Sequence, residues 1–373
     1  MRKIFLVILF FAIIQFAVSQ DDYANILNLM KNGELKQAKE LVDKLTTKDQ
    51  GNSKIWLHRG AVYQTLYESE NPEFKALHND PLNESYYSFK KSMELDLTNE
   101  YLQINLKSLG ILSNLFVKKG IDEFNAGDFK EAFRSFENNI EINERPAIML
   151  LDTIIYYNAA ISAEKIGKYD KAEYYLKKLI VFKYNSPQMY LDLAGVYKKQ
   201  NDLVKYKSTL NDGIAACPGE NIGLISEFIN YYLSIGNIEK TLEYIEEGIK
   251  IEPENPDFYF IRGSISDQKG ETEKARKDYF LTIEKEPEHI DALYNLGAIY
   301  FNEGLTTEKN AMSKADKKNA EEKYFEAIKY FEKVHNIDNS DSQTIKLLIQ
   351  LYSTTSQENK KTEMEKKFLN LNN

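Results

Sequence analysis

Cysteine, proline and tryptophan are scarce in this sequence of 373 residues, and each shortage excludes something. The one cysteine, Cys217, has no partner for an intrachain disulfide, so the fold must be stabilised by packing alone. Only 8 prolines and 17 glycines interrupt the chain, which leaves room for long helices. The chain has one tryptophan but 25 tyrosines and 20 phenylalanines, a composition that fits many interfaces between helices filled by aromatic rings.

The sequence also lacks the usual marks of a metal site, a nucleotide site or an active site. No two of the four histidines (His58, His78, His289 and His335) lie at the spacing of a helical metal pair, and no Cys-x-x-Cys occurs. No glycine-rich phosphate loop is present. The many carboxylates are typical of the solvated faces of amphipathic helices. We therefore expect no metal, no cofactor and no catalytic residues, and we predict that the protein is not an enzyme.

Positive charge is in the minority, and no block of clustered lysine and arginine stands out. The formal net charge is −9, which a phosphate backbone would repel. We therefore expect no nucleic-acid partner.

Only the N-terminus contains a long apolar run. Arg2 and Lys3 precede a run from Ile4 to Val18 that is apolar apart from Gln15, and Ala17 and Ser19 are small residues at the positions that a signal peptidase reads. The run of about 15 residues is shorter than the roughly 20 needed to cross a bilayer. This pattern predicts a cleaved signal peptide at residues 1–19, with an uncleaved signal anchor as the alternative. After cleavage we expect no membrane span, because no other segment approaches that length.

From about residue 113 onward the sequence repeats itself. The pattern Gly127-x-Phe129-x-x-Ala132-x-x-x-Phe136 recurs with Gly167 and Ala172, with Gly236, and with Gly270 and Ala275. Pro218, Pro253 and Pro287 recur at an interval of about 34 residues, and Gly263 and Gly297 share that interval. Ala327-x-x-x-Phe331 extends the series. A fixed period of this length is the signature of a repeat architecture.

The repeat resembles the tetratricopeptide (TPR) repeat, whose signature combines W-x2-L-G-x2-Y with A-x3-F and a closing proline. Leu296-Gly297-x-x-Tyr300 matches the first half, and Trp56, Gly60 and Tyr63 match an earlier copy in which Arg59 replaces the usual leucine. The resemblance implies an all-α, right-handed superhelical solenoid of antiparallel helix pairs, with about 8–9 repeats. Glycines, alanines and prolines are assigned to its turns and to the seams between its helices: Gly127, Ala132, Gly167, Ala172, Gly236, Pro253, Gly263, Gly270, Ala275, Pro287, Gly297 and Ala327.

The match predicts three parts after the signal peptide. Residues 20–112 form divergent TPR-like repeats with an insertion at 68–83, and residues 113–303 form the regular array. Residues 304–373 form a further repeat with a helical insertion at 303–323, followed by C-terminal capping helices. Both insertions fall between the two helices of a pair and should project from one edge of the solenoid, either as docking elements or as tolerated surface loops.

In the TPR family the inner groove is lined mainly by the first helix of each pair. Carried over by resemblance, that register places thirteen residues on the binding wall: Tyr157, Glu164, Gln188, Leu191, Lys198, Ser226, Asn230, Phe260, Ser264, Asp267, Asp291, Tyr294 and Phe301. The aromatic residues among them either anchor a partner segment or pack on the next helix pair.

Taken together, the sequence predicts a non-enzymatic scaffold or adaptor that binds segments of partner proteins. The expected partners are components of an envelope or secretion assembly. The expected location is periplasmic or secreted, with a bacterial envelope favoured and a eukaryotic secretory setting left open. The alternative is a soluble ligand- or glycan-binding receptor built on the same repeats.

Overall fold

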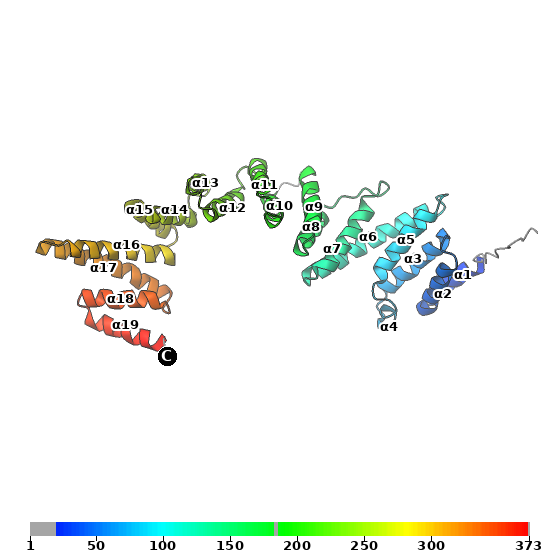
Figure 1. The fold of residues 1–373 in the computed structure, drawn as a ribbon. Helices are drawn as coiled ribbons and strands as arrows, with labels where there is room; N and C mark the ends of the chain where they lie inside the picture. The colour runs from blue at the N-terminus through cyan, green and yellow to red at the C-terminus, as the bar shows by residue number, and fades with distance from the viewer. Residues whose placement is uncertain (1–19, 183–185, 372–373) are drawn as a thin grey trace, which may run out of the picture. The chain divides into compact units, whose positions relative to one another are not determined.

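A computed structural model describes residues 20–182 and 186–371, so the expected signal peptide at 1–19 lies outside the described residues. The described part contains 19 helices and no strand (Figure 1). Their bounds are α1 Gln20–Lys31, α2 Leu35–Lys48, α3 Ser53–Glu68, α4 Pro72–Lys75, α5 Pro81–Leu95, α6 Leu102–Asn125, α7 Phe129–Asn143, α8 Thr153–Lys165, α9 Tyr169–Val181, α10 Pro187–Lys199, α11 Leu203–Ala216, α12 Ile222–Ser234, α13 Ile238–Ile251, α14 Pro256–Gln268, α15 Thr272–Lys285, α16 Ile290–Lys309, α17 Lys314–Ile337, α18 Ser342–Thr354 and α19 Glu358–Leu371.

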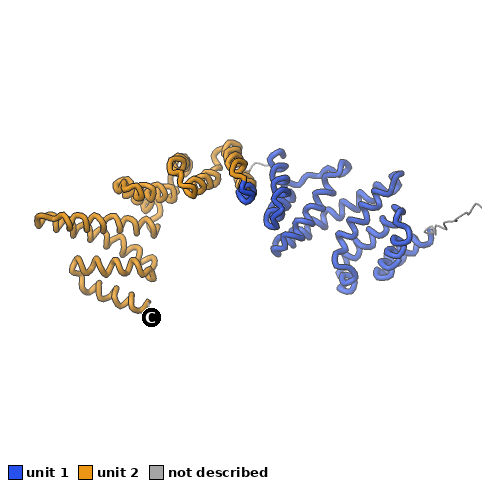
Figure 2. Tube along the Cα trace, viewed as in Figure 1, with its two compact units in different colours: residues 1–185, 195–201 blue, residues 186–194, 202–373 orange. Residues whose placement is uncertain are grey.

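The helices fall into two compact units, coloured separately in Figure 2. The first comprises residues 1–185 with 195–201, and the second comprises residues 186–194 with 202–373, so α10 contributes to both. Within each unit the two helices of a pair pack on one another, as α6 does on α7 and α14 on α15. The second helix of a pair also packs on the first helix of the next, as α7 does on α8 and α15 on α16. Such nearest-neighbour packing is how a helical-repeat array buries its apolar faces.

In most pairs, a residue with left-handed backbone conformation closes the turn between the two helices. Gly127, Gly167, Gly236 and Gly270 have φ between 70° and 79°, the region that costs glycine least. Two backbone bonds accompany each turn, for example from the amide of Gly127 to the carbonyl of Phe124 and from the next amide to the carbonyl of residue 123. These bonds satisfy carbonyl groups that the end of the first helix leaves unpaired.

Three further pairs have the same turn, and at Asn201 and Ser356 the repeat pattern in the sequence did not predict it. Gly33 takes this position in the first pair, while Asn201 and Ser356 take it with φ of 58° and 54°. Two pairs have no left-handed residue between their helices, namely α3 with α5 and α16 with α17. These are the pairs that carry the insertions.

Glycines in the first helices make room for aromatic rings from the second helices. A Cβ on Gly120 would stand 2.7 Å from the Phe136 ring, and one on Gly263 would stand 3.0 Å from the Tyr279 ring. In these two pairs the ring follows the glycine at the same interval in the sequence. The glycine and the ring therefore mark equivalent positions of the repeat.

The pairs with insertions keep this seam. Gly60 and Gly297 make the same approach to Phe89 and Phe331, but the ring follows the glycine at a longer interval in the sequence. The additional residues lie in the connection and in the extended ends of the helices. The insertions therefore lengthen the pairs without displacing the contact between their helices.

The two insertions take different forms. The first contains the short helix α4, between Glu68 at the end of α3 and Pro81 at the start of α5. The second lengthens α16 and α17 and leaves only residues 310–313 between them. The expected part boundaries at 112/113 and 303/304 do not coincide with helix ends, because they fall inside α6 and α16. Sequence similarity begins at residue 113 because the first half of α6 lacks the motif, although the helix itself is continuous.

The residues assigned to seams and turns differ in their exposure. Ala132, Ala172, Ala275 and Ala327 are fully buried. Pro253 and Pro287 are exposed in the connections that follow α13 and α15. Among the described residues no helix is both long enough and apolar enough to cross a membrane.

Candidate binding surfaces

The thirteen residues expected on the binding wall all lie on first helices, namely α8, α10, α12, α14 and α16, and none of them is buried. Asn230, Asp267 and Asp291 are exposed on α12, α14 and α16 of the second unit. Ser226 is half-buried on α12. The second unit therefore presents polar groups from three first helices to solvent.

The aromatic members of the wall in the second unit also hold successive pairs together. The Phe260 ring lies 4.7 Å from the His289 ring, centroid to centroid, at the start of α16. The Tyr294 hydroxyl on α16 accepts a hydrogen bond of 2.7 Å from the Gln343 amide on α18. Phe260 and Tyr294 remain partly exposed. The rings therefore pack on the next helix pair, and their role as anchors for a partner segment stays a prediction.

The remaining wall residues are largely occupied by local contacts. Phe301 packs 6.1 Å from the ring of Tyr324, and Ser264 accepts a bond of 3.5 Å from Tyr279. Glu164 accepts a hydrogen bond from Lys199. In the half of α10 that belongs to the second unit, Gln188 donates to Asp192 at 2.9 Å and Leu191 contacts Gly223 on α12. Tyr157 and Lys198 are also engaged with other groups.

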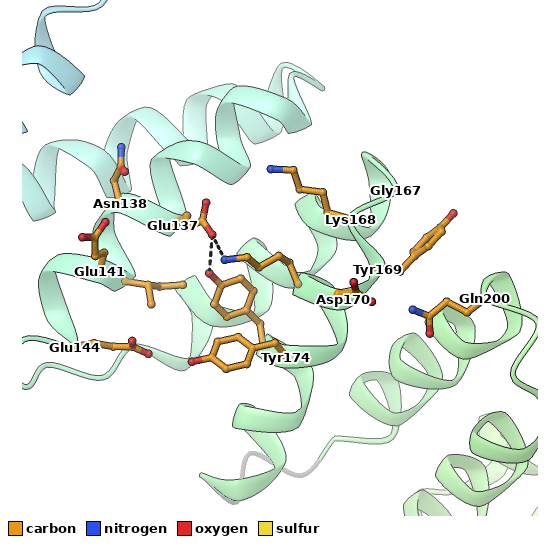
Figure 3. A pocket seen from close by; sticks show the side chains of 13 residues that line it. Glu137, Asn138, Glu141, Glu144, Gly167, Lys168, Tyr169, Asp170, Tyr174 and Gln200 are labelled. Atoms are coloured by element: carbon orange, nitrogen blue, oxygen red, sulfur yellow. Dashed lines mark hydrogen bonds and ion pairs between the residues drawn. The ribbon is translucent and has the colours of Figure 1, made fainter. Parts of the chain in front are cut away.

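A second surface lies between second helices, where sequence reasoning placed no site. A cavity of about 890 Å³ opens between α7 and the start of α9 (Figure 3). None of the thirteen wall residues lines it. Glu137, Glu141 and Glu144 follow one face of α7 at helical spacing, and Tyr174 extends toward Glu144 from α9 (Figure 3). The spacing of these glutamates was the available signal, but a row of acids usually means only a solvated face.

The charges around this cavity are neutralised within the protein. Glu137 accepts a hydrogen bond of 2.5 Å from Lys171, and Glu141 accepts one of 2.5 Å from Lys90. Glu144 is bonded by Lys178 and, at 2.5 Å, by the hydroxyl of Tyr156. Burial raises the pKa of Glu144, but the bonds from Lys178 and Tyr156 outweigh it and hold that pKa below its usual value. The pKa of Glu141 is likewise held below its usual value, in spite of burial, by its bond from Lys90. Carboxylates that are paired in this way suit recognition or structural support.

An arginine links neighbouring second helices in the first unit. Arg59 lies on α3, directly before Gly60. Its Nε bonds Asp43 on α2 at 3.0 Å, and its Nη1 bonds Glu84 on α5. The guanidinium lies 5.5 Å from the centroid of the Trp56 ring. The arginine that departs from the usual leucine of the motif thus joins its own pair to the preceding one.

The second unit contains the same arrangement on α14. Arg262 directly precedes Gly263 and forms two bonds to Asp278 on α15, at 2.9 Å and 2.7 Å. Its third bond, of 2.6 Å, reaches Glu246 on α13. Arg262 lies 5.5 Å from the ring of Tyr259. Because the position relative to the glycine is the same, this arginine is a recurring device that fixes the step between pairs.

Burial shifts the pKa of two reactive side chains, Cys217 and His58. Cys217 is buried, and burial raises the pKa of its thiol, which disfavours the nucleophilic thiolate. Burial, with a smaller effect from Lys54, lowers the pKa of His58 to about 4, so this histidine is neutral at physiological pH. Within residues 20–182 and 186–371 no group of three or more histidine, cysteine or carboxylate side chains is placed to hold a metal.

Comparison with known proteins identifies the fold. No family model matches this sequence, and no curated protein matches it. The C-terminal part of a TPR repeat-containing protein from Cytophaga hutchinsonii is 14% identical, with a TM-score of 0.51 over 68% of this chain and 94% of that chain. A TPR repeats protein from Bacteroides fragilis is 20% identical, with a TM-score of 0.27 over 65% of this chain and 98% of its own. YrrB, described as a TPR protein with an unusual peptide-binding site, is 18% identical, with a TM-score of 0.37 over 56% and 95%.

The Cytophaga protein shares this fold over more than two thirds of the chain, and the helix pairs, turns and glycine–aromatic seams described above are those of a repeat array. In its fold this chain is therefore a TPR-type protein, an all-α solenoid of antiparallel helix pairs.

Proposed function

We propose that this chain is an exported, non-enzymatic scaffold that holds segments of partner proteins along the first helices of its second unit. The observation that carries the proposal is the state of Phe260 and Tyr294. Each ring contacts a residue of the next helix pair and is nevertheless not buried. Rings fixed in this way lose little conformational entropy on binding, so they make effective anchors.

The polar residues beside these rings fit the same role. Asp267 and Asp291 are exposed on the same two helices as the rings. A partner segment that carries an apolar residue flanked by basic residues would match this combination. The envelope location is proposed from the leader pattern at residues 1–19.

Site-specific photocrosslinking in the native host tests the binding surface. A photoreactive residue at Asp267 or Asp291 should give a defined adduct with a partner protein, and the same residue at Glu243 should not. Glu243 is an exposed control on the second helix α13. Adducts at Glu243 only, or heat from oligosaccharide titration without any protein adduct, would favour a different surface or the glycan-receptor alternative.

Export is tested by a measurement separate from that of the binding surface. We expect the mature protein in an envelope fraction with Gln20 as its first residue. A cytosolic protein that retains residues 1–19 would contradict the proposed location and leave the binding surface to be judged separately.

A further inference from the structure

The hairpin formed by α16 and α17 extends beyond its neighbours. Helices α16 and α17 have 20 and 24 residues, whereas α14 and α18 have 13 each and α15 and α19 have 14 each. At 1.5 Å per residue the additional length is about 10–15 Å. Figure 1 shows the joined ends of α16 and α17 extending past the ends of α15 and α18. We call residues 309–318, at that end, the hairpin tip.

The hairpin tip is basic, although the chain as a whole is acidic. It carries four lysines and one aspartate, while the net charge of the chain is −9. Many lysines in the described part of this chain have a carboxylate partner. The side chains of Lys309, Lys314 and Lys317 are exposed and have no such partner among the described residues. The fourth, Lys318, lies 3.8 Å from Glu322, both of them highly exposed.

An apolar side chain stands among these lysines. Met312 is 98% exposed at the turn, the highest exposure among the large apolar side chains of the described residues. An unbranched thioether is apolar and flexible enough to enter an irregular apolar layer. The hairpin tip therefore presents one apolar group surrounded by unpaired positive charge.

The backbone of the turn is satisfied from within. The Asp316 carboxylate accepts bonds from the amides of Met312, at 3.0 Å, and Ser313, at 2.8 Å, and the Ser313 hydroxyl accepts a bond from the amide of Asp316. Unpaired amides are costly away from water, so a closed turn suits entry into a poorly hydrated layer. These bonds to Asp316 also occupy the only acidic side chain in the tip.

We propose that the hairpin tip is a contact site for an anionic phospholipid bilayer surface. The lysines would lie among the phosphate headgroups, with Met312 at the boundary with the acyl chains. A juxtaposed cluster of lysines gains free energy from the negative potential of such a surface. A protruding tip can reach a flat bilayer surface while the rest of the acidic protein stays away from it. A protein partner would not require this protrusion, because its binding site could match a surface of any shape.

The amount of protrusion supports the same assignment. The Debye length at physiological ionic strength is about 8 Å, and the tip extends about 10–15 Å beyond its neighbours. When the tip touches the headgroups, the carboxylates of the neighbouring helix pairs, α14 with α15 and α18 with α19, lie at least about one Debye length away and are largely screened. The local charge of the tip then decides the interaction, although the net charge of the chain is negative.

Vesicle sedimentation with the full chain tests the proposal. The probes are vesicles of phosphatidylcholine alone and vesicles that also contain a large fraction of phosphatidylglycerol. The measured quantity is the difference in partitioning between the two, so any contribution of the apolar run at 4–18 is common to all variants. The test variant is Lys309→Gln with Lys314→Gln and Lys317→Gln. The control variant is Lys36→Gln with Lys130→Gln and Lys250→Gln, which removes the same charge from lysines on three other helices.

We expect the wild type and the control variant to prefer the anionic vesicles, and added salt to weaken that preference. The tip variant should partition at least tenfold, and up to about 100-fold, less into the anionic vesicles. Circular dichroism must show that all three proteins are equally folded. A wild type without preference for anionic vesicles overturns the proposal, as does an equal loss in both variants. If the wild type does not bind anionic vesicles, while a polyglutamate column retains the wild type but not the tip variant, the tip contacts an acidic protein instead and the bilayer assignment is wrong.

Discussion

The close approach between Gly297 and Phe331 gives a quantitative test of how the helices of a pair fit together. A Cβ on Gly297 would stand 2.9 Å from two atoms of the Phe331 ring, which is fully buried and has no space to withdraw. Overpacking of this kind costs about 1–3 kcal/mol. Alanine in place of glycine in a helix gains about 1 kcal/mol, so Gly297→Ala should change the free energy of unfolding by about 0–2 kcal/mol in the destabilising direction.

A matched glycine separates the clash from the gain in helix propensity. Gly110 lies inside α6, and a Cβ there would meet nothing within 4 Å. Gly110→Ala should therefore stabilise the protein by about 0.5–1 kcal/mol.

A double-mutant cycle isolates the clash itself. Phe331→Leu removes the ring that Gly297→Ala would strike, so the alanine should be tolerated better in the presence of the leucine. We expect a coupling free energy of about 1–3 kcal/mol between the two substitutions. Chemical denaturation followed by circular dichroism gives the four free energies. A coupling near zero, or equal stabilisation by Gly110→Ala and Gly297→Ala, would refute the assigned seam.

Four further changes test other parts of the account. Ala172→Leu should overpack a fully buried position and cost about 1–3 kcal/mol in denaturation experiments, and an unchanged midpoint would contradict the seam assigned to α9. Arg262→Met should cost about 1.5–3 kcal/mol, because it removes two charge-assisted bonds to Asp278 of its own pair and one to Glu246 of the preceding pair, and a neutral result would mean that the arginine does not stabilise this junction. The folded-state pKa of Glu144 is depressed, so its contribution to the free energy of unfolding is present above its unfolded pKa of about 4.3 and is lost as the pH falls through the folded-state pKa. Glu144→Gln should therefore be less stable than the wild type at neutral pH, and the difference should vanish in acid. A difference in stability that does not depend on pH would contradict this linkage. Truncation after Leu348 should uncover the apolar cluster between α17 and α19 and cause aggregation in light scattering, whereas a monodisperse product would contradict the capping role of the last helices.

The repeat and its turns were accessible from the sequence because each depends on one residue type at one spacing. Glycines such as Gly127 and Gly270 can be recognised in the sequence because a left-handed turn favours glycine. Asn201 and Ser356 adopt the same conformation. Asparagine is tolerated at such a position, whereas serine gives no signal for it in the sequence.

The binding surfaces were only partly accessible. The register of the TPR family places the wall residues on first helices, but it does not say that the hydroxyl of Tyr294 is bonded to Gln343 in the next pair. The cavity beside Glu141 was not predicted because it needs the two second helices α7 and α9 at a particular distance, and pairing of side chains across them, Glu137 with Lys171 and Glu144 with Lys178, decides its charge. The length of the hairpin insertion was visible, whereas the absence of carboxylate partners for Lys309 and its neighbours among the described residues required the structure.

An experimental structure of the chain tests the central claim most directly if it is examined at one contact. The claim is that within each unit an antiparallel helix pair stacks on the next, with first helices side by side. It predicts a hydrogen bond of about 2.7 Å between the Gln343 amide on α18 and the Tyr294 hydroxyl on α16. A structure in which α16 and α18 are not neighbours, or in which these segments form strands, would contradict it.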